Sequence, residues 1–331
     1  MRAYIYGRSA LAVLRYLRGI ADERVFDVVP RVRVSNAVLH KVSQLSQLSF
    51  ESELLLRHAG EQLELLVFDK ALVSQRKGLC YHLWGRPIPS GAFIRLNDEL
   101  YLSSPAFIFL QLAQELNPFE LALVGMELCG MFAKTGNETK DFRSRDVENR
   151  NVEFGLKPAC SKRRIETLLK NVKGAWGAKQ ARVVASWITD NAASPMESAA
   201  YLLLTLPRKR GGYGLPQPAL NPELRFRDNR ETITRYPDLY WKSHSIDVEY
   251  QSDYAHTGNW RRYLDSKRQV LLTINDVTVL PLTRDQLMNV DDFHAFAHGL
   301  QKLLGIRKRP VSPDWEFQRA QLRKALLLSQ V

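Results

Sequence analysis

Cysteine is scarce in this chain, which has three in 331 residues: Cys80, Cys129 and Cys160. They are far apart and odd in number. None stands in a CxxC pair, and no Cys/His pair has zinc-site spacing. The sequence therefore predicts neither a disulfide framework nor a structural zinc site, and it favours a reducing, cytoplasmic environment.

Long apolar runs are also missing. The first apolar stretch is broken by Arg8, Arg15 and Arg18. No segment reaches the roughly 18 uninterrupted apolar residues that a membrane-spanning helix requires. We therefore expect no signal peptide, no membrane span and no membrane partner.

Acidic residues are the minority charge. Lys and Arg number 47 against 35 Asp and Glu, which gives a net charge of +12. A positive field favours polyanionic partners, so the composition points to nucleic acid. Hydrophobic residues make up 45% of the chain, enough for a sizeable core, and the length suggests two domains.

In the first half, local signals predict a mixed α/β structure. "AYIYG" predicts a short strand ending at Gly7, followed by a helix that Ser9 can cap. Alternating aromatics with Gly and Pro predict β-rich structure over residues 78–103. Ser104–Pro105 and Asn117–Pro118 each combine a capping residue with proline in the first turn, so two apolar helices should begin there.

In the second half, a polar stretch over residues 134–151 indicates a loop or boundary. Helices are expected over residues 161–172, 178–192 and 194–207. A hairpin, a helix, a short strand at 277–282 and a helical tail should follow. The predicted fold class is α/β, in the α+β sense.

The hairpin carries an unusual set of acids. In "SIDVEYQ", Asp247, Glu249 and Gln251 alternate with apolar residues, so one face should pack on a core and the other present the three polar side chains together. The turn "KSHS" would fold this strand back on "PDLYW". That pairing would bring Asp238 toward Glu249.

Two close carboxylates repel each other, and a hard divalent cation such as Mg²⁺ or Mn²⁺ relieves the repulsion. The pattern therefore indicates a metal site at Asp238 and Glu249. An ordinary solvent-facing acidic hairpin explains the same residues. Upstream, "SPME" places Glu197 in the first turn of a helix, where it also fits a capping box that bonds to the Ser194 amide.

The order "SPMES", "YGLPQPALN", "YPDLYW", "IDVEYQSDYAH" and "RRYLDSKRQVLL" resembles the PD-(D/E)XK nuclease superfamily, and within it the very-short-patch-repair endonuclease-like branch. The resemblance covers roughly residues 193–287. It implies a restriction-endonuclease-like domain with a central mixed sheet flanked by helices.

The resemblance also implies roles for individual residues. Asp238 and Glu249 would be ligands of Mg²⁺, Glu197 an accessory acid, and His256 a proton-transfer or phosphate-orienting group; an ordinary surface histidine fits His256 equally. Gln251 stands where such enzymes often have Lys or Asp. Because glutamine carries no charge and is no base, this departure weakens the case for activity.

Basic residues on the following helix would contact the DNA backbone. The candidates are Arg261, Arg262, Lys267 and Arg268, with Arg268 also able to pair with Asp265. The triplets Arg208, Lys209, Arg210 and Arg307–Arg309 extend this track. A solvated helix face and soluble loops explain the same charges.

The first half resembles AbiEi-like antitoxin regions through "YHLWGRPIPSGAF" and "LSSPAFIFLQLAQEL". A winged helix, often present in that group, is not recognisable, which weakens an expectation of operator-specific repression. The predicted organisation is an AbiEi-like domain at 1–135, a linker with connecting helices at 136–190, a nuclease-like domain at 191–290 and a helical extension at 291–331.

These features predict a metal-dependent DNA endonuclease, in a defence, toxin–antitoxin or repair setting. The alternative is a non-catalytic nucleic-acid-binding or antitoxin-like regulator on a degenerate nuclease fold. Both functions predict DNA as the partner. A protein partner or a homodimer is compatible with either function.

Overall fold

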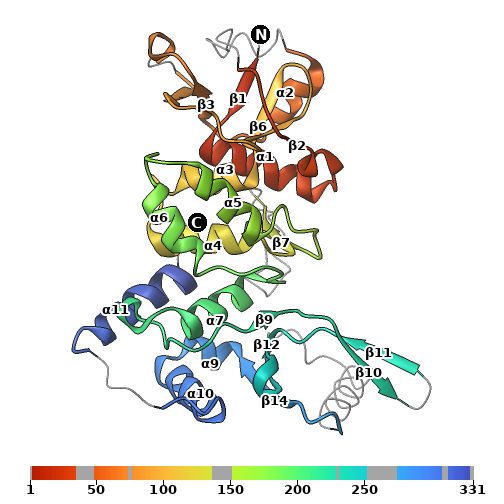
Figure 1. Cartoon of the computed structure of the whole chain (residues 1–331), viewed down its shortest axis with the longest axis vertical. Coiled ribbons are helices and arrows are strands. Elements are labelled where there is room, and N and C mark those ends of the chain that lie inside the picture. Colours follow the sequence, from red (N-terminus) through yellow and green to blue (C-terminus); the bar gives the residue numbers. More distant parts are fainter. Residues whose placement is uncertain are drawn as a thin grey trace. The chain divides into compact units, whose positions relative to one another are not determined.

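The computed structural model describes residues 2–34, 48–73, 77–135, 151–228, 231–251, 274–307 and 312–328. The chain forms two compact units, Met1–Ser186 and Trp187–Val331. Each combines helices with a mixed sheet (Figure 1), so the predicted α/β class is confirmed. The finer division at residues 136, 191 and 291 stays a prediction. Within the described residues, no helix is both long and apolar enough to span a membrane.

The first unit is built on a six-stranded sheet in the order β2-β5-β6-β1-β3-β4. Strand β1 runs parallel to β6, β3 runs parallel to β4, and the other pairs are antiparallel. Its strands are β1 Ala3–Ile5, β2 Val28–Val29, β3 Leu63–Val67, β4 Leu79–Leu83, β5 Phe93–Arg95 and β6 Leu100–Ser103. The β-rich segment expected between residues 78 and 103 is therefore present.

Helices and a small second sheet complete this unit. They are α1 Gly7–Gly19, η1 Glu23–Phe26, α2 Phe50–Leu56, η3 Lys70–Leu72, α3 Pro105–Leu112, α4 Pro118–Leu128, β7 Phe132–Lys134, β8 Val152–Phe154, α5 Lys162–Asn171 and α6 Ala178–Ala185. Ser104 and Asn117 cap α3 and α4 as predicted, each with proline in the first turn. Helix α6 ends at Ala185, earlier than the predicted residue 192.

The start of α1 differs from the prediction. Tyr6, not Ser9, is the N-cap residue, and its side chain makes no capping hydrogen bond. Ser9 lies inside the first turn, where its hydroxyl donates to the carbonyl oxygen of Ala59 at 2.7 Å. The backbone N–H groups of Arg8 and Ser9 donate to a Glu64 carboxylate oxygen at 2.6 and 3.3 Å. A side chain from β3 thus replaces the local cap.

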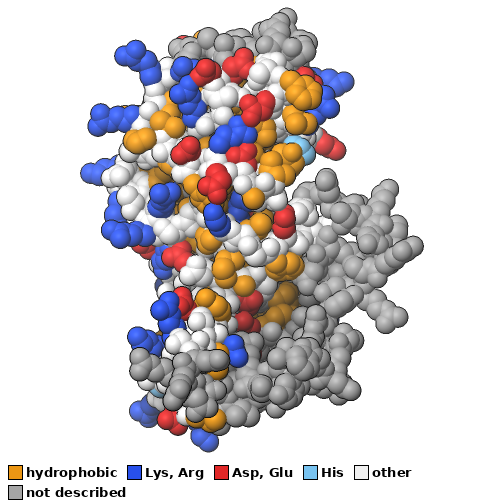
Figure 2. Space-filling model, turned by 90° about the vertical axis from the view of Figure 1, so that its right-hand side faces the viewer, with side chains coloured by type: hydrophobic (Ala, Val, Ile, Leu, Met, Phe, Trp, Pro, Cys, Tyr) orange, Lys and Arg blue, Asp and Glu red, His pale blue; other side chains and the backbone are white. Residues whose placement is uncertain are grey.

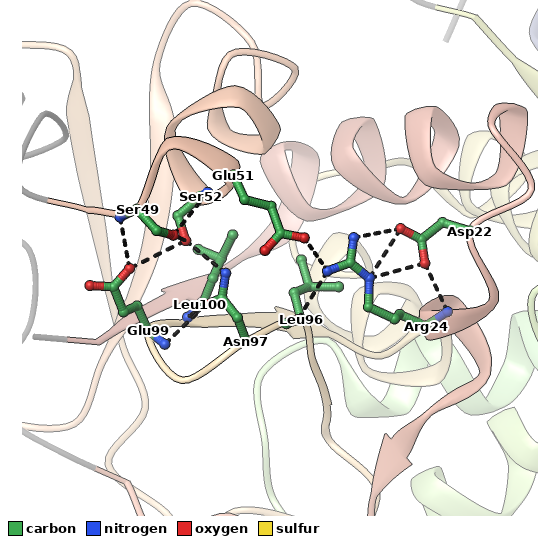
Figure 3. A network of polar contacts seen from close by, with 9 residues as sticks. All are labelled: Asp22, Arg24, Ser49, Glu51, Ser52, Leu96, Asn97, Glu99 and Leu100. Atoms are coloured by element: carbon green, nitrogen blue, oxygen red, sulfur yellow. Dashed lines mark hydrogen bonds and ion pairs between the residues drawn. The ribbon is translucent and has the colours of Figure 1, made fainter.

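A polar network joins η1, α2 and the β5–β6 turn (Figure 3). The Arg24 guanidinium pairs with Glu51 of α2 and donates to the carbonyl oxygen of Leu96 at 3.1 Å. The carboxylate of Glu99 accepts from the N–H of Ser49, the α2 N-cap, at 3.0 Å. These contacts hold the start of α2 against the sheet.

The second unit contains a four-stranded sheet in the order β14-β13-β12-β9, and the β10–β11 hairpin extends from it (Figure 1). Its elements are α7 Pro195–Thr205, η4 Arg208–Arg210, β9 Ala219–Leu220, β10 Leu224–Asp228, β11 Glu231–Arg235, β12 Leu239–Trp241, η5 Lys242–His244, β13 Ile246–Gln251, β14 Thr278–Thr283, α9 Arg284–Met288, α10 Val290–Leu303, α11 Trp315–Arg323 and η7 Lys324–Leu328. The predicted hairpin, short strand and helical tail are confirmed; the β10–β11 hairpin was not anticipated.

The topology of this sheet is mixed. Strand β12 is antiparallel to both β9 and β13, whereas β14 is parallel to β13. Helix α7 precedes the strands and is buried from Glu197 to Leu204. Along the chain, helix α7 is thus followed by the antiparallel strands β9, β12 and β13, and then by β14, which is parallel to β13.

Candidate functional site

The β12–β13 ladder ends one residue after Asp238 in the chain. Leu239 pairs with Val248 and Tyr240 pairs with Asp247 in this antiparallel ladder. The same register continued by one step would set Asp238 against Glu249, and directly opposed residues point to the same face of a sheet. The strand pairing predicted from the turn "KSHS" is confirmed, and the approach of Asp238 to Glu249 stays a prediction.

Asp238 is held by a backbone hydrogen bond. Its Oδ2 accepts from the N–H of Tyr250 at 2.8 Å. The Asp238 carbonyl oxygen accepts from the N–H of Asn221, beside the end of β9, at 3.2 Å. Both contacts lie at the end of the β12–β13 ladder, so the orientation of Asp238 depends on the pairing of three strands.

Glu197 joins the same group from α7. Its Oε2 accepts from the side-chain amide of Asn221 at 2.9 Å and from the N–H of Ala193 at 3.0 Å. Burial raises the pKa of Glu197, and the charge of Glu249 adds to that increase. The two carboxylates therefore interact, and Asn221 links Glu197 to Asp238.

The capping-box alternative for Glu197 is only partly realised. The hydroxyl of Ser194 accepts from the N–H of Glu197 at 3.1 Å, as an N-cap should. The Glu197 carboxylate accepts from the N–H of Ala193, one residue before the N-cap, and forms a side-chain hydrogen bond with Ser194. Glu197 thus contributes to the start of α7, and the charge of Glu249 acts on its carboxylate.

The acidic face of β13 is less open than the alternation predicted. Asp247 is 0% exposed, whereas Glu249 and Gln251 are half-buried. The reason is tertiary: Asp247 lies between Tyr240 and Val279 in the sheet register, and Tyr240 packs in a cluster with Val279 and the side chains of β10. The expectation that Asp247 would be presented with Glu249 was wrong.

The remaining candidates divide between described and undescribed residues. Gln251 ends β13 and pairs with Thr283 of β14. Residues outside the described ranges are His256, Arg261, Arg262, Asp265, Lys267, Arg268, Lys308 and Arg309.

The basic triplet Arg208–Arg210 is described, and it forms the short helix η4 rather than a loop. Lys209 and Arg210 are exposed, and the Arg210 guanidinium lies 5.8 Å from the ring centroid of Trp187. Where Figure 2 shows described side chains, Lys and Arg stand among Asp and Glu. Lys209 is thus the triplet's charge most open to a polyanion.

The donor set of the site suits a hard cation. Asp238 and Glu249 offer carboxylate oxygens, which Mg²⁺ and Mn²⁺ prefer. Within the described residues, Glu197, Asp238 and Glu249 do not gather their oxygens within 4.8 Å of one another as a three-ligand group. Asp238 and Glu249 therefore stay the predicted ligand pair, without Glu197 as a third ligand.

A three-ligand group does form in the first unit, from Glu64, His82 and Glu115. Sequence reasoning missed it because the three residues have no motif spacing. The available signal was "CYH", which puts Cys80 and His82 on one face of a strand.

No protein-family model, no curated protein and no solved structure matches this chain.

Proposed function

We propose that the second unit is a metal-dependent nuclease that hydrolyses phosphodiester bonds in DNA. The observation that supports the proposal is the β12–β13 register, which continued by one step would set Asp238 against Glu249, with Glu249 adding to the raised pKa of the buried Glu197. Like charges brought close together favour a bound cation. The mixed sheet agrees with the sheet that a PD-(D/E)XK resemblance implies.

Asp238 and Glu249 would hold the Mg²⁺ or Mn²⁺. When bound there, such an ion stabilises charge on the phosphate and lowers the pKa of a water molecule. The N–H of Tyr250 orients Asp238, and Asn221 orients Glu197. Glu197 would act as an accessory acid beside Glu249.

Gln251 favours the second candidate, a non-catalytic DNA-binding regulator. It occupies the position two residues after Glu249, where it can donate or accept hydrogen bonds but carries no charge. A nuclease would need another group for that role. Both candidates involve DNA, in keeping with the net charge of +12, and both act in the cytoplasm.

Plasmid nicking tests the proposal. The purified chain is incubated with supercoiled DNA and Mg²⁺ or Mn²⁺, and the same assay is run on Glu249→Gln and on Glu316→Gln. Glu316 is an exposed acid on α11 and provides the matched control. The nuclease proposal expects nicking by the unaltered chain and by Glu316→Gln, and loss of nicking in Glu249→Gln.

Absence of nicking by the well-folded unaltered chain, on every DNA form and with both ions, would contradict the nuclease proposal. If the same samples then bound DNA, the result would support the non-catalytic DNA-binding regulator. Equal nicking by Glu249→Gln and the unaltered chain would place the activity elsewhere.

A further inference from the structure

Metal-ligating side chains converge at one edge of the six-stranded sheet, in the first unit. Glu64 lies on β3, Cys80 and His82 lie on the edge strand β4, and Glu115 follows α3. Glu64 pairs with Cys80 in the β3–β4 register, and His82 is two residues further along. These three side chains therefore share one face of the sheet.

Neighbouring residues orient the histidine. The ring of Tyr6 stacks on the His82 imidazole, with centroids 3.9 Å apart and an angle of 15° between the planes. The Tyr6 hydroxyl accepts from the side-chain amide of Gln114 at 3.2 Å. The imidazole is thus held with its Nε2 toward Glu64 and Cys80.

The Glu64 carboxylate is divided between two functions. Its Oε2 accepts the N–H groups at the start of α1, while its Oε1 lies 3.7 Å from His82 Nε2. Burial alone would raise the pKa of Glu64, but His82 and the N–H groups of Ser9 and Arg8 hold that pKa below its usual value. Oε2 is thus used at the start of α1, and Oε1 is the oxygen that faces His82.

The distances suit an ion between the side chains. Direct hydrogen bonds join heavy atoms about 2.7–3.2 Å apart, and 3.7 Å is longer. Zinc–ligand bonds of about 2.0 Å to nitrogen and about 2.1 Å to oxygen give tetrahedral edges of about 3.3 Å. Ligand atoms of Glu64, His82 and Glu115 all lie within 4.8 Å of one another.

The local charge also favours a cation. Two carboxylates, Glu64 and Glu115, face the His82 imidazole. Among the described residues, Arg8 pairs with Glu115, its Nε lying 3.1 Å from Glu115 Oε2, and the Arg8 side chain is 59% exposed. A divalent ion would compete with this exposed guanidinium for Glu115.

We propose that Glu64, His82 and Glu115 bind a zinc-class transition-metal ion. An imidazole ligand favours Zn²⁺ and Co²⁺ over Mg²⁺, which prefers oxygen. The site differs in chemistry from the carboxylate pair of the second unit. A role for Glu64 solely as acceptor at the start of α1 accounts for Oε2, but leaves the convergence of Oε1, His82 and Glu115 unexplained.

The test is a Zn²⁺ titration of the full chain after chelator treatment, followed by calorimetry or by competition with a chromophoric chelator. We expect one Zn²⁺ at this site, with no competition from Mg²⁺. His82→Ala and Glu115→Gln should each weaken Zn²⁺ binding at least about tenfold, because each removes a ligand. Glu115 is exposed, so its variant tests the site without disturbing the core.

Arg8→Gln gives a prediction of opposite sign. Removing the competing cation should tighten Zn²⁺ binding, an effect that a purely structural role for these residues would not produce. Co²⁺ provides a spectroscopic check, because His82→Ala should change its visible absorption. Glu61→Gln, an exposed acid nearby in the chain, should leave Zn²⁺ affinity unchanged.

Absence of stoichiometric Zn²⁺ binding would overturn the proposal. So would equal Zn²⁺ affinity in the unaltered chain, His82→Ala and Glu115→Gln. Neither outcome bears on the nuclease proposal, since Glu249 belongs to the other unit.

Discussion

Asp238 accepts a hydrogen bond through its side-chain Oδ2 from the backbone N–H of Tyr250, at 2.8 Å. This bond spans the two strands of the hairpin, one step past the last ladder pair. The Asp238 carboxylate therefore has a structural function, and the same carboxylate would also be the proposed metal ligand. The two functions can be separated by substitution.

Asp238→Asn and Asp238→Ala should differ in stability but not in cleavage. Asparagine keeps an acceptor for the Tyr250 N–H, so its free energy of unfolding should stay near that of the unaltered chain. Alanine leaves the N–H without its acceptor and should cost about 1–3 kcal/mol. Both remove the ligand charge and should abolish plasmid nicking. Urea unfolding and the nicking assay measure the two effects; a fully active Asp238→Asn would contradict the ligand assignment.

Lys209→Ala should weaken DNA binding by either candidate function. An exposed lysine that contacts phosphate contributes about one unit to the slope of log affinity against log salt concentration. The measurement is a salt titration of binding to a short duplex. Lys302→Ala, on the exposed side of α10, is the matched control. If log affinity falls with log salt concentration at the same slope for both variants and the unaltered chain, then η4 does not contact DNA.

Glu127 should make stability depend on acid pH. Both of its carboxylate oxygens accept from the Arg15 guanidinium at 2.7 Å, and it is almost completely buried. Burial would raise the pKa of Glu127, but Arg15 and the N–H of Lys134 outweigh burial and lower it below 4.5. The pair therefore stabilises the fold above that pH and loses this contribution as pH falls through the lowered value.

Glu127→Gln should lower the free energy of unfolding by about 3 kcal/mol at neutral pH, because it leaves the half-buried Arg15 charge without its partner. The difference from the unaltered chain should narrow below pH 4.5. Thermal unfolding across pH 3 to 7 provides the check. Glu120→Gln, at the exposed start of α4, is the control. If the free energies of unfolding of Glu127→Gln and the unaltered chain differ by the same amount from pH 3 to 7, then the titration of Glu127 is not coupled to folding.

Gly7→Ala should destabilise the first unit more than Gly60→Ala. Both glycines have positive φ, +52° and +95°, so alanine is strained at either. A Cβ at residue 7 would also lie 2.6 Å from Glu64 Oε2, whereas residue 60 has open space. We expect about 1–2 kcal/mol from backbone strain alone at each position, and a further loss at residue 7. Urea unfolding compares them; equal losses would show that Glu64 moves aside freely.

Local signals predicted those features that a few neighbouring residues decide. Ser104, Asn117 and Ser194 cap the helices expected of them, because a capping oxygen reaches N–H groups only two or three residues away. The β12–β13 pairing was predictable for a similar reason. A short turn sets the register, and register then determines which side chains oppose each other.

Contacts between distant segments were not predictable. Ser9 looked like a cap, but Glu64, 55 residues away, supplies the acceptor at the start of α1. Asp247 fitted an open acidic face, yet it is fully buried, between Tyr240 and Val279 in the sheet register. The assembly of Glu64, His82 and Glu115 likewise depends on a parallel pairing that no local turn specifies.

By itself, the sequence determined the starts of α3, α4 and α7 and the β12–β13 hairpin, since each results from interactions over a few residues or one turn. Only the tertiary structure decided which polar groups are buried and which ligands converge in the first unit. Those outcomes depend on packing between elements far apart in the chain, and neither periodicity nor spacing carries that information.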